Sequence, residues 1–227
     1  MPTREKKLMF GAAFLTSVLS FVIICVVLGT QRWISSTVDF SLSNSSSISV
    51  TITYGLFSGT CASTIQGGVQ VSDTNFQVAE LLSSTRKGIN ITIIVLLVLS
   101  LLSSLLSSGF TFTNAVSNPY QTFLGPIGVY TWNAIGGFFT LIVMILFAVN
   151  VQGNNLSVEL AAKCTSTQQN HSRSKHNYDY SYWILLLHIL FSCATIVIII
   201  FYSCARYSKK KEQERPIENA SKDVILF

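Results

Sequence analysis

Charged side chains are missing from the middle of this chain. No Asp, Glu, Lys or Arg occurs between Lys87 and Glu159, an interval of 71 residues. A soluble domain of that size needs charged residues on its solvated surface, so a purely soluble fold is excluded here. The interval instead contains two apolar runs, 89–112 and 127–149, and each reaches the roughly 20 residues needed to cross a bilayer core. The middle of the chain is therefore predicted to lie in a membrane.

Catalytic and metal-binding signatures are also missing. The chain has no phosphate-binding Gly-rich loop ending in Lys-Ser or Lys-Thr, no His-Glu-x-x-His and no Gly-x-Ser-x-Gly. We interpret His171 and His176 as solvated loop residues, because no cysteine or acidic pair lies near them at metal-ligand spacing. The sequence therefore predicts a protein that is not an enzyme and that has no cofactor and no metal site.

The apolar runs contain no acidic or basic side chain apart from one imidazole, that of His188. Carboxylates, lysines and arginines within a membrane usually mark ion pathways and proton relays. We interpret His188 as the partner of a Ser or Thr on a neighbouring helix, in preference to a relay or ligand role.

Two further apolar runs, 8–28 and 183–204, bring the expected spans to four. The first run is too long for the apolar part of a secretory signal, which has about 7 to 15 residues, so we interpret it as an uncleaved helix. Basic residues cluster just before the first run and just after the last, and such clusters mark the cytoplasmic face: Arg4, Lys6, Lys7, Arg206, Lys209, Lys210, Lys211 and Arg215. Both termini are therefore predicted to be cytoplasmic.

This orientation defines the expected segments of an all-α membrane protein, a four-helix transmembrane bundle with a small extracellular antiparallel β-sheet. Apolar and hydroxyl side chains alternate over 48–54, which is typical of a strand with one buried face. Residues 69–71 are its candidate partner strand, and Asp73 or Thr74 is expected to cap a short helix after it. The expected segments are a cytoplasmic N-terminus (1–7), spans 8–28, 89–112, 127–149 and 183–204, extracellular loops 29–88 and 150–182, a cytoplasmic loop 113–126 and a cytoplasmic tail (205–227).

Small residues form stripes on two of the expected spans. Ser100, Ser104 and Ser108 recur at four-residue spacing, and the third span contains Gly136 and Gly137. Because lipid tails compete for apolar contacts, membrane helices pack through small residues, and we predict that these stripes are helix contacts. A polar pathway for a solute is the alternative. Aromatic residues beside the spans are expected in an interfacial belt: Trp33, Tyr178, Tyr180, Tyr182 and Trp183.

The expected outer loops contain candidate modification sites. Asn44, Asn155 and Asn170 begin Asn-x-Ser sequons and are predicted glycosylation sites. Cys61 and Cys164 lie one in each loop, where an oxidising environment permits a disulfide between them, with two unpaired thiols as the equal alternative.

The cytoplasmic end offers two candidate sites. Cys204 lies beside Arg206 at the end of the last span, a position suited to palmitoylation or simply to a free thiol. The chain ends in Ile225, Leu226 and Phe227, which fits the strand-like ligand of a PDZ domain or an apolar end without a partner.

Several segments resemble the clarin family of four-span membrane glycoproteins, and the resemblance covers essentially the whole chain. They are a Lys-rich start leading into 8–10, the segment 28–34 (LGTQRWI), the loop motif 53–57 (TYGLF) and 118–126 (NPYQTFLGP) continuing through 128–130. Trp33, 55–57 and Cys61 are also distantly similar to the loop signature of claudins. Phe57 stands where claudins have a second Trp, and no second loop cysteine precedes Gly88, which excludes the claudin disulfide.

The clarin resemblance implies a non-enzymatic plasma-membrane scaffold or adaptor. Such proteins organise membrane, junctional or synaptic complexes and the actin beneath them, with sensory hair cells and photoreceptors as known settings. The implied partners are the lipid bilayer, membrane or junctional proteins and a PDZ-domain protein, with no nucleic acid and no small-molecule substrate. A small channel or auxiliary channel subunit is the alternative function.

Overall fold

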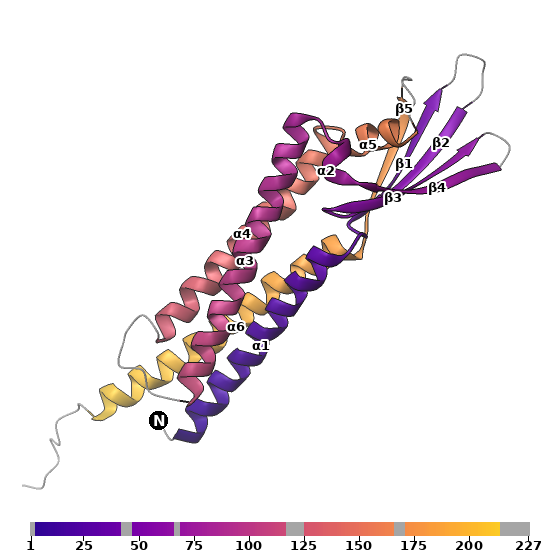
Figure 1. Cartoon of the computed structure of the whole chain (residues 1–227). Coiled ribbons are helices and arrows are strands. Elements are labelled where there is room, and N and C mark those ends of the chain that lie inside the picture. The colour runs from indigo at the N-terminus through magenta and orange to yellow at the C-terminus, as the bar shows by residue number, and fades with distance from the viewer. Residues whose placement is uncertain (1–2, 42–46, 66–68, 117–124, 166–170, 214–227) are drawn as a thin grey trace, which may run out of the picture.

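Four long helices lie side by side, and a β-sheet stands at one end of them (Figure 1). The computed structural model describes residues 3–41, 47–65, 69–116, 125–165 and 171–213. The long helices are α1 (Thr3–Gly29), α3 (Ser84–Val116), α4 (Pro126–Gln152) and α6 (Tyr180–Gln213), and all four are long and apolar enough to cross a membrane. The predicted combination of four apolar helices with a small antiparallel sheet is confirmed.

The long helices form a closed ring. α1 packs against α3 and α6, and α4 packs against the same two helices on the other side. At a rise of about 1.5 Å per residue, α3 is roughly 50 Å long, whereas the hydrocarbon core is about 30 Å thick, so this helix continues well beyond its apolar run. Large apolar side chains cover the outside of the ring and are exposed there, among them Leu15, Leu105, Phe138 and Phe201. This outer surface suits contact with lipid.

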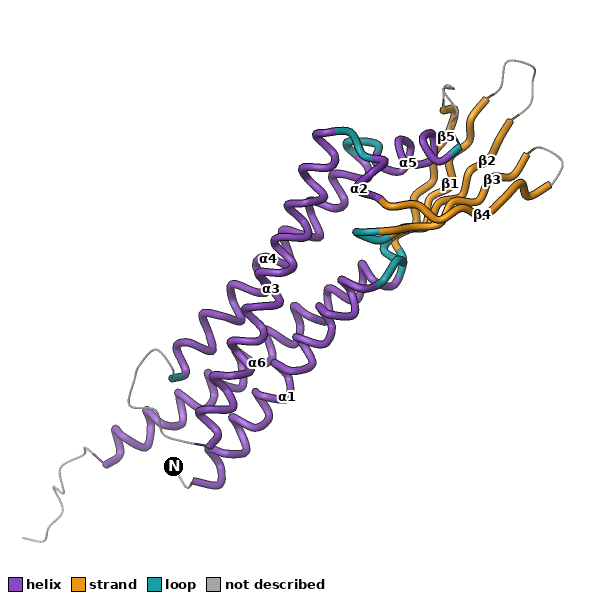
Figure 2. Tube along the Cα trace, in the orientation of Figure 1, coloured by secondary structure: helices purple, strands orange, loops and turns teal. Residues whose placement is uncertain are grey.

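The sheet has five antiparallel strands in the order β4-β3-β2-β1-β5 (Figure 2). The first four strands follow α1, and β5 comes from the connection between α4 and α6. The strands are β1 (Ile34–Ser41), β2 (Ser47–Tyr54), β3 (Ser58–Ile65), β4 (Val69–Gln77) and β5 (His171–Tyr178). The expected helix cap at Asp73 or Thr74 is wrong, because both residues lie within β4 and the single turn α2 (Val78–Leu81) begins only after it.

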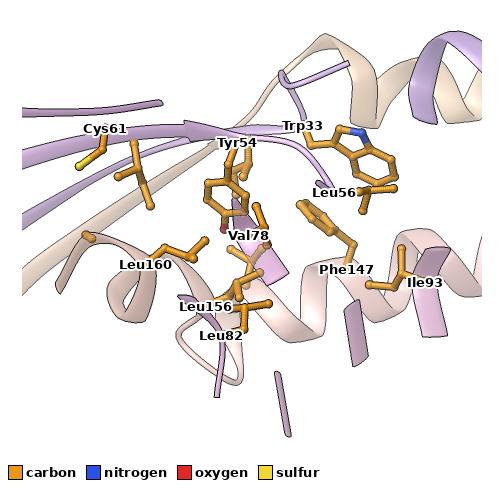
Figure 3. Packing of buried hydrophobic residues seen from close by; sticks show 14 of the residues in the cluster. Trp33, Tyr54, Leu56, Cys61, Val78, Leu82, Ile93, Phe147, Leu156 and Leu160 are labelled. Carbon is orange, nitrogen blue, oxygen red and sulfur yellow. The ribbon is translucent and has the colours of Figure 1, made fainter. Parts of the chain in front are cut away.

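A short helix, α5 (Leu156–Cys164), covers one face of the sheet. One buried cluster connects this face with α5 and with the adjoining ends of the long helices, and Figure 3 shows Trp33, Tyr54, Leu56, Phe147 and Leu160 within it. The sheet and the bundle therefore share a single hydrophobic core.

Trp33 is not part of an interfacial belt, and that prediction was wrong. Its side chain is fully buried, its Nε1 donates a hydrogen bond to the Val27 carbonyl at 3.0 Å, and its ring centroid lies 4.9 Å from that of Phe147. The chain turns back over the end of α1 into β1, which carries Trp33 beneath the sheet. Tyr180 and Trp183, in contrast, are exposed at the start of α6.

Candidate functional site: an ectodomain fixed to a bundle with a polar interior

Hydroxyl and amide side chains line the interior of the bundle and bond across its helices. Ser17 Oγ of α1 lies 3.0 Å from Ser107 Oγ of α3, and Asn133 Nδ2 of α4 donates to the same Ser107 oxygen at 2.6 Å. Thr16 Oγ1 of α1 lies 2.7 Å from Thr195 Oγ1 of α6. Buried polar groups in a membrane need such partners, because neither lipid nor water satisfies them there. We call these interhelical contacts the polar seam.

His188 is the centre of the polar seam. Its ring is fully buried, with Nε2 3.2 Å from Ser104 Oγ of α3 and Nδ1 3.1 Å from Thr140 Oγ1 of α4. Both ring nitrogens therefore have hydroxyl partners on neighbouring helices, which confirms the predicted pairing of this histidine with a Ser or Thr. The side chain joins three of the four helices.

The small residues of α3 and α4 lie in direct contact. Ser100 Oγ donates to the Gly136 carbonyl at 3.0 Å, and a Cβ added at Gly136 would lie 3.4 Å from Ser103 Cβ. Gly137 faces α6, where its nearest neighbour would be Ser192 Cβ at 3.9 Å. Ser108 is buried, and its hydroxyl donates a hydrogen bond to the Ser104 carbonyl of its own helix at 2.9 Å.

An ion-pair cluster connects α5 with the start of α3. Glu159 Oε2 accepts from Arg86 at 2.6 Å, and its Oε1 lies 3.0 Å from Lys163 Nζ and accepts from the Ser83 backbone N–H, also at 3.0 Å. Burial by itself would raise the pKa of the Glu159 carboxyl, but the hydrogen bonds and charges of Arg86 and Lys163 outweigh it and hold that pKa below its usual value. The Arg86 Nε also donates to the Asn154 carbonyl at 2.5 Å.

The two predicted loop cysteines come together in the structure. Cys61 of β3 and Cys164 at the end of α5 form a disulfide, with a Cα–Cα distance of 6.7 Å and a sequence separation of 103. The bond joins the sheet to the helix that covers it. Cys25, Cys193 and Cys204 are free and exposed.

A buried hydrogen-bond chain, which the sequence analysis missed, runs beneath the sheet. Tyr54 OH lies 2.8 Å from Ser157 Oγ, which lies 2.9 Å from Ser36 Oγ, which in turn lies 3.0 Å from His176 Nδ1. His176 is thus a half-buried residue of β5 and not a solvated loop residue, and burial lowers its pKa. Burial also raises the pKa of the Tyr54 hydroxyl. These hydrogen bonds connect β1, β2 and β5 to α5.

The opposite face of the sheet is polar and open. Across β5, β1, β2 and β3, directly paired residues share this face in three rows. They are Asn177, Ser35, Thr53 and Thr60 in the first row, Lys175, Thr37, Thr51 and Ala62 in the second, and Arg173, Asp39, Ser49 and Thr64 in the third. We call it the outer sheet face. Within the described strands β4 and β5 each pair on one side only, so two edges are also accessible.

The remaining predicted sites are spread along the chain. Asn155 is exposed directly before α5, with a left-handed φ of 51°. Asn44, Asn170 and the terminal residues 225–227 lie outside the described residues. Among the described residues, no three His, Cys, Asp or Glu side chains are grouped as metal ligands.

A four-helix bundle with a polar, hydrogen-bonded interior and a sheet that shares its hydrophobic core defines a multi-pass membrane protein. Comparison with known protein sequences shows which family of membrane proteins the chain belongs to. The family described as Clarin-2-like matches residues 5–200. Clarin-3 of Homo sapiens is 49% identical over 228 residues, and Clarin-3 of Rattus norvegicus is 50% identical over 230, with full coverage of both chains in each case. Clarin-1 of Mus musculus is 27% identical over 197 residues, which covers 82% of this chain and 84% of the relative. The chain belongs to the clarin family.

Proposed function

We propose that this protein is a scaffold or adaptor of the plasma membrane, with both termini in the cytoplasm. The observation that carries the proposal is the shared core between the sheet and the four-helix ring. A surface held in this way keeps a fixed position and orientation relative to the bilayer. The outer sheet face and its two open edges then offer binding surfaces to membrane or junctional proteins, while the tail serves partners on the other side.

The interior of the bundle favours this function over a small channel. A pore would need the Ser and Gly stripes of α3 and α4 as its lining, but Ser100 and Ser103 of α3 contact Gly136 of α4 directly, and Gly137 faces Ser192 of α6. The His188 ring is held between two other helices. Liposomes containing the purified chain are therefore expected to pass no more ions than empty liposomes. Ion flux above that background would favour the channel or auxiliary-subunit function.

The cytoplasmic tail is the proposed site for a PDZ-domain protein, and through it for the actin cytoskeleton. A PDZ groove takes the terminal side chain and the one two residues before it, whereas the side chain between them points away. Proximity labelling from the tail should therefore recover PDZ-domain proteins from wild type and from Leu226→Ala, but not from Phe227→Ala. Equal recovery from all three chains would remove the PDZ proposal while leaving the sheet-based role to be tested separately.

Modification offers a direct test of the proposed orientation. Asn44, Asn155 and Asn170 are proposed to carry glycan, and Cys204, exposed near the end of α6, is proposed to be palmitoylated. Asn90 also begins a sequon, but it is only 4% exposed and its Nδ2 donates to the Leu56 carbonyl at 3.0 Å. Enzymatic removal of glycan should shift the gel mobility of wild type and of Asn90→Gln by the same amount. No shift in a chain expressed at the cell surface would contradict the extracellular placement of the three sequons.

A further inference from the structure

A polar pocket lies where the outer sheet face meets the ends of two membrane helices. Its volume is about 310 Å³, and it is lined by Gln31, Arg32, Ser35, Thr53, Thr60 and Asp179. The three hydroxyl residues belong to the first row of the outer sheet face, and Thr53 Oγ1 donates to Ser35 Oγ at 3.2 Å. We call it the interfacial pocket. It lies on the side of the sheet opposite the hydrophobic core.

Short connections place the interfacial pocket at headgroup depth. Arg32 follows the end of α1 at Gly29 by three residues, and Asp179 directly precedes the first residue of α6. The headgroup layer on each side of a bilayer is roughly 5–8 Å thick, the difference between about 30 Å of hydrocarbon and 40–45 Å overall. Both side chains therefore emerge within or next to that layer.

The walls of the interfacial pocket are fixed by backbone hydrogen bonds. The Asp179 N–H donates to the Trp33 carbonyl at 3.0 Å, and the Ser181 N–H donates to the Arg32 carbonyl at 3.2 Å. The Trp33 N–H in turn donates to the Tyr54 carbonyl at 3.1 Å. The ends of α1, β2 and the start of α6 are thus joined around the pocket, so it is preformed and does not depend on a mobile loop.

The charges in the interfacial pocket are one cation and one anion that are not bonded to each other. Neither Arg32 nor Asp179 forms an ion pair with any residue that the structure describes. One Asp179 oxygen accepts the Tyr180 N–H at 2.7 Å, which leaves the other oxygen to face a cation. A guanidinium with hydroxyls beside it suits a phosphate, and a carboxylate suits an ammonium group.

We propose that the interfacial pocket binds the zwitterionic headgroup of one membrane phospholipid, with Arg32 on the phosphate and Asp179 on the ammonium group. A ligand carrying both charges satisfies both side chains, whereas a purely anionic headgroup would face the Asp179 carboxylate unpaired. The volume is at the lower end of the range for ligand sites and suits a headgroup, with the acyl chains left in the bilayer beside α1 and α6. The proposed orientation of the protein makes this the outer leaflet.

Lipid retention by the purified full chain tests the proposal. The chain is held in detergent with equal amounts of phosphatidylcholine and phosphatidylglycerol, and native mass spectrometry counts the bound lipids. Wild type is expected to retain phosphatidylcholine in preference. Arg32→Gln should lower its retention about tenfold, as expected for the loss of a charge-assisted contact to phosphate. Arg32→Lys, which keeps the charge, should restore part of it.

Two further variants separate binding in the interfacial pocket from general effects. Asp179→Asn keeps an oxygen for the Tyr180 N–H and should abolish the preference by raising phosphatidylglycerol retention to that of phosphatidylcholine. Arg173→Gln, an exposed change two rows further along the same sheet face, should leave retention unchanged.

The proposal is overturned if Arg32→Gln behaves like Arg173→Gln, or if wild type prefers phosphatidylglycerol. Soluble glycerophosphocholine could also bind the delipidated chain as tightly as phosphatidylcholine does. That result would assign the pocket to a free phosphodiester and overturn the lipid assignment. Because neither binding to the tail nor ion flux enters this assay, its outcome is independent of the scaffold proposal.

Discussion

Loss of the bond between Cys61 and Cys164 should destabilise the ectodomain by about 4 kcal/mol. The loop that the bond closes has 103 residues, but α3 and α4 account for 33 and 27 of them and stay helical in the bilayer when the sheet unfolds. About 43 residues are then free to gain entropy. Because the entropic term depends on the logarithm of loop length, this shorter loop still gives about 4 kcal/mol, compared with about 4.7 for a fully flexible loop of 100 residues.

The assay combines thiol counting with denaturant unfolding of the purified full chain, followed by tryptophan fluorescence. The chain has five cysteines, three of which are free in the structure. Once hydroxylamine has removed any palmitate from Cys204, a maleimide of high mass should add three times to the denatured wild type and five times after reduction. Cys61→Ser should add four without reductant. Cys61→Ser, Cys164→Ser and the double substitution should all lose the same free energy of unfolding, because each removes the same bond.

Cys204→Ser is the matched control, because it removes an exposed free thiol and should not change the unfolding midpoint. Five additions to wild type without reductant would refute the reasoning. So would losses from the two single substitutions that add up in the double, since independent sites and not a shared bond would then be responsible.

Three further substitutions test the ion-pair cluster and the glycine contacts. Glu159→Gln should cost about 2 kcal/mol, because the carboxylate loses partners that water only partly replaces. Because the folded-state pKa of Glu159 is held low, wild-type stability should also fall as the pH drops below about 4, and this decline should be smaller in the variant, as measured from the denaturant midpoint. Gly55→Ala should cost about 1–3 kcal/mol in the same assay, because the new Cβ would collide with the Thr30 carbonyl. Gly136→Leu should cost a similar amount, of order 1–3 kcal/mol, by forcing α3 from α4 at Ser103, and should lower the thermal midpoint in detergent.

Matched glycines supply the controls. A Cβ at Gly88 or Gly109 would meet no atom within 4 Å, so Gly88→Ala and Gly109→Leu should be close to neutral. Equal losses from Gly109→Leu and Gly136→Leu would mean that helix contact is not the cause. A Glu159→Gln chain with the same acid dependence as wild type would assign that dependence to other carboxylates.

The helices, β2 and the start of β4 could be predicted because their patterns are local. The expected pairing of 69–71 with 48–54 is wrong, because β4 pairs with β3 and β3 lies between β4 and β2. The four apolar runs are long enough that no soluble element competes with a span. In β2 the inward residues Val50, Ile52 and Tyr54 are apolar while the residues between them carry hydroxyls, so the two-residue period is visible in the sequence.

The missed strands take their structure from partners far away in the chain. β1 has the same period as β2, but Ser36 interrupts its apolar face, and this residue is buried only because Ser157 and His176 satisfy its hydroxyl. β5 has no apolar alternation at all and is a strand because it pairs with β1. Trp33 was assigned to the membrane surface for a similar reason, since nothing nearby in the sequence indicates that Phe147 lies against it.

The second extramembrane connection therefore determines the shape of the first. It supplies β5, which extends the sheet beside β1, and α5, which covers the inner face and reaches the start of α3 through Glu159 and Arg86. The sheet is thus completed only when α4 and α6 have brought this connection to it. The same buried cluster joins the inner face of the sheet to the adjoining ends of α1, α3, α4 and α6, so the position of the sheet depends on how these helix ends pack.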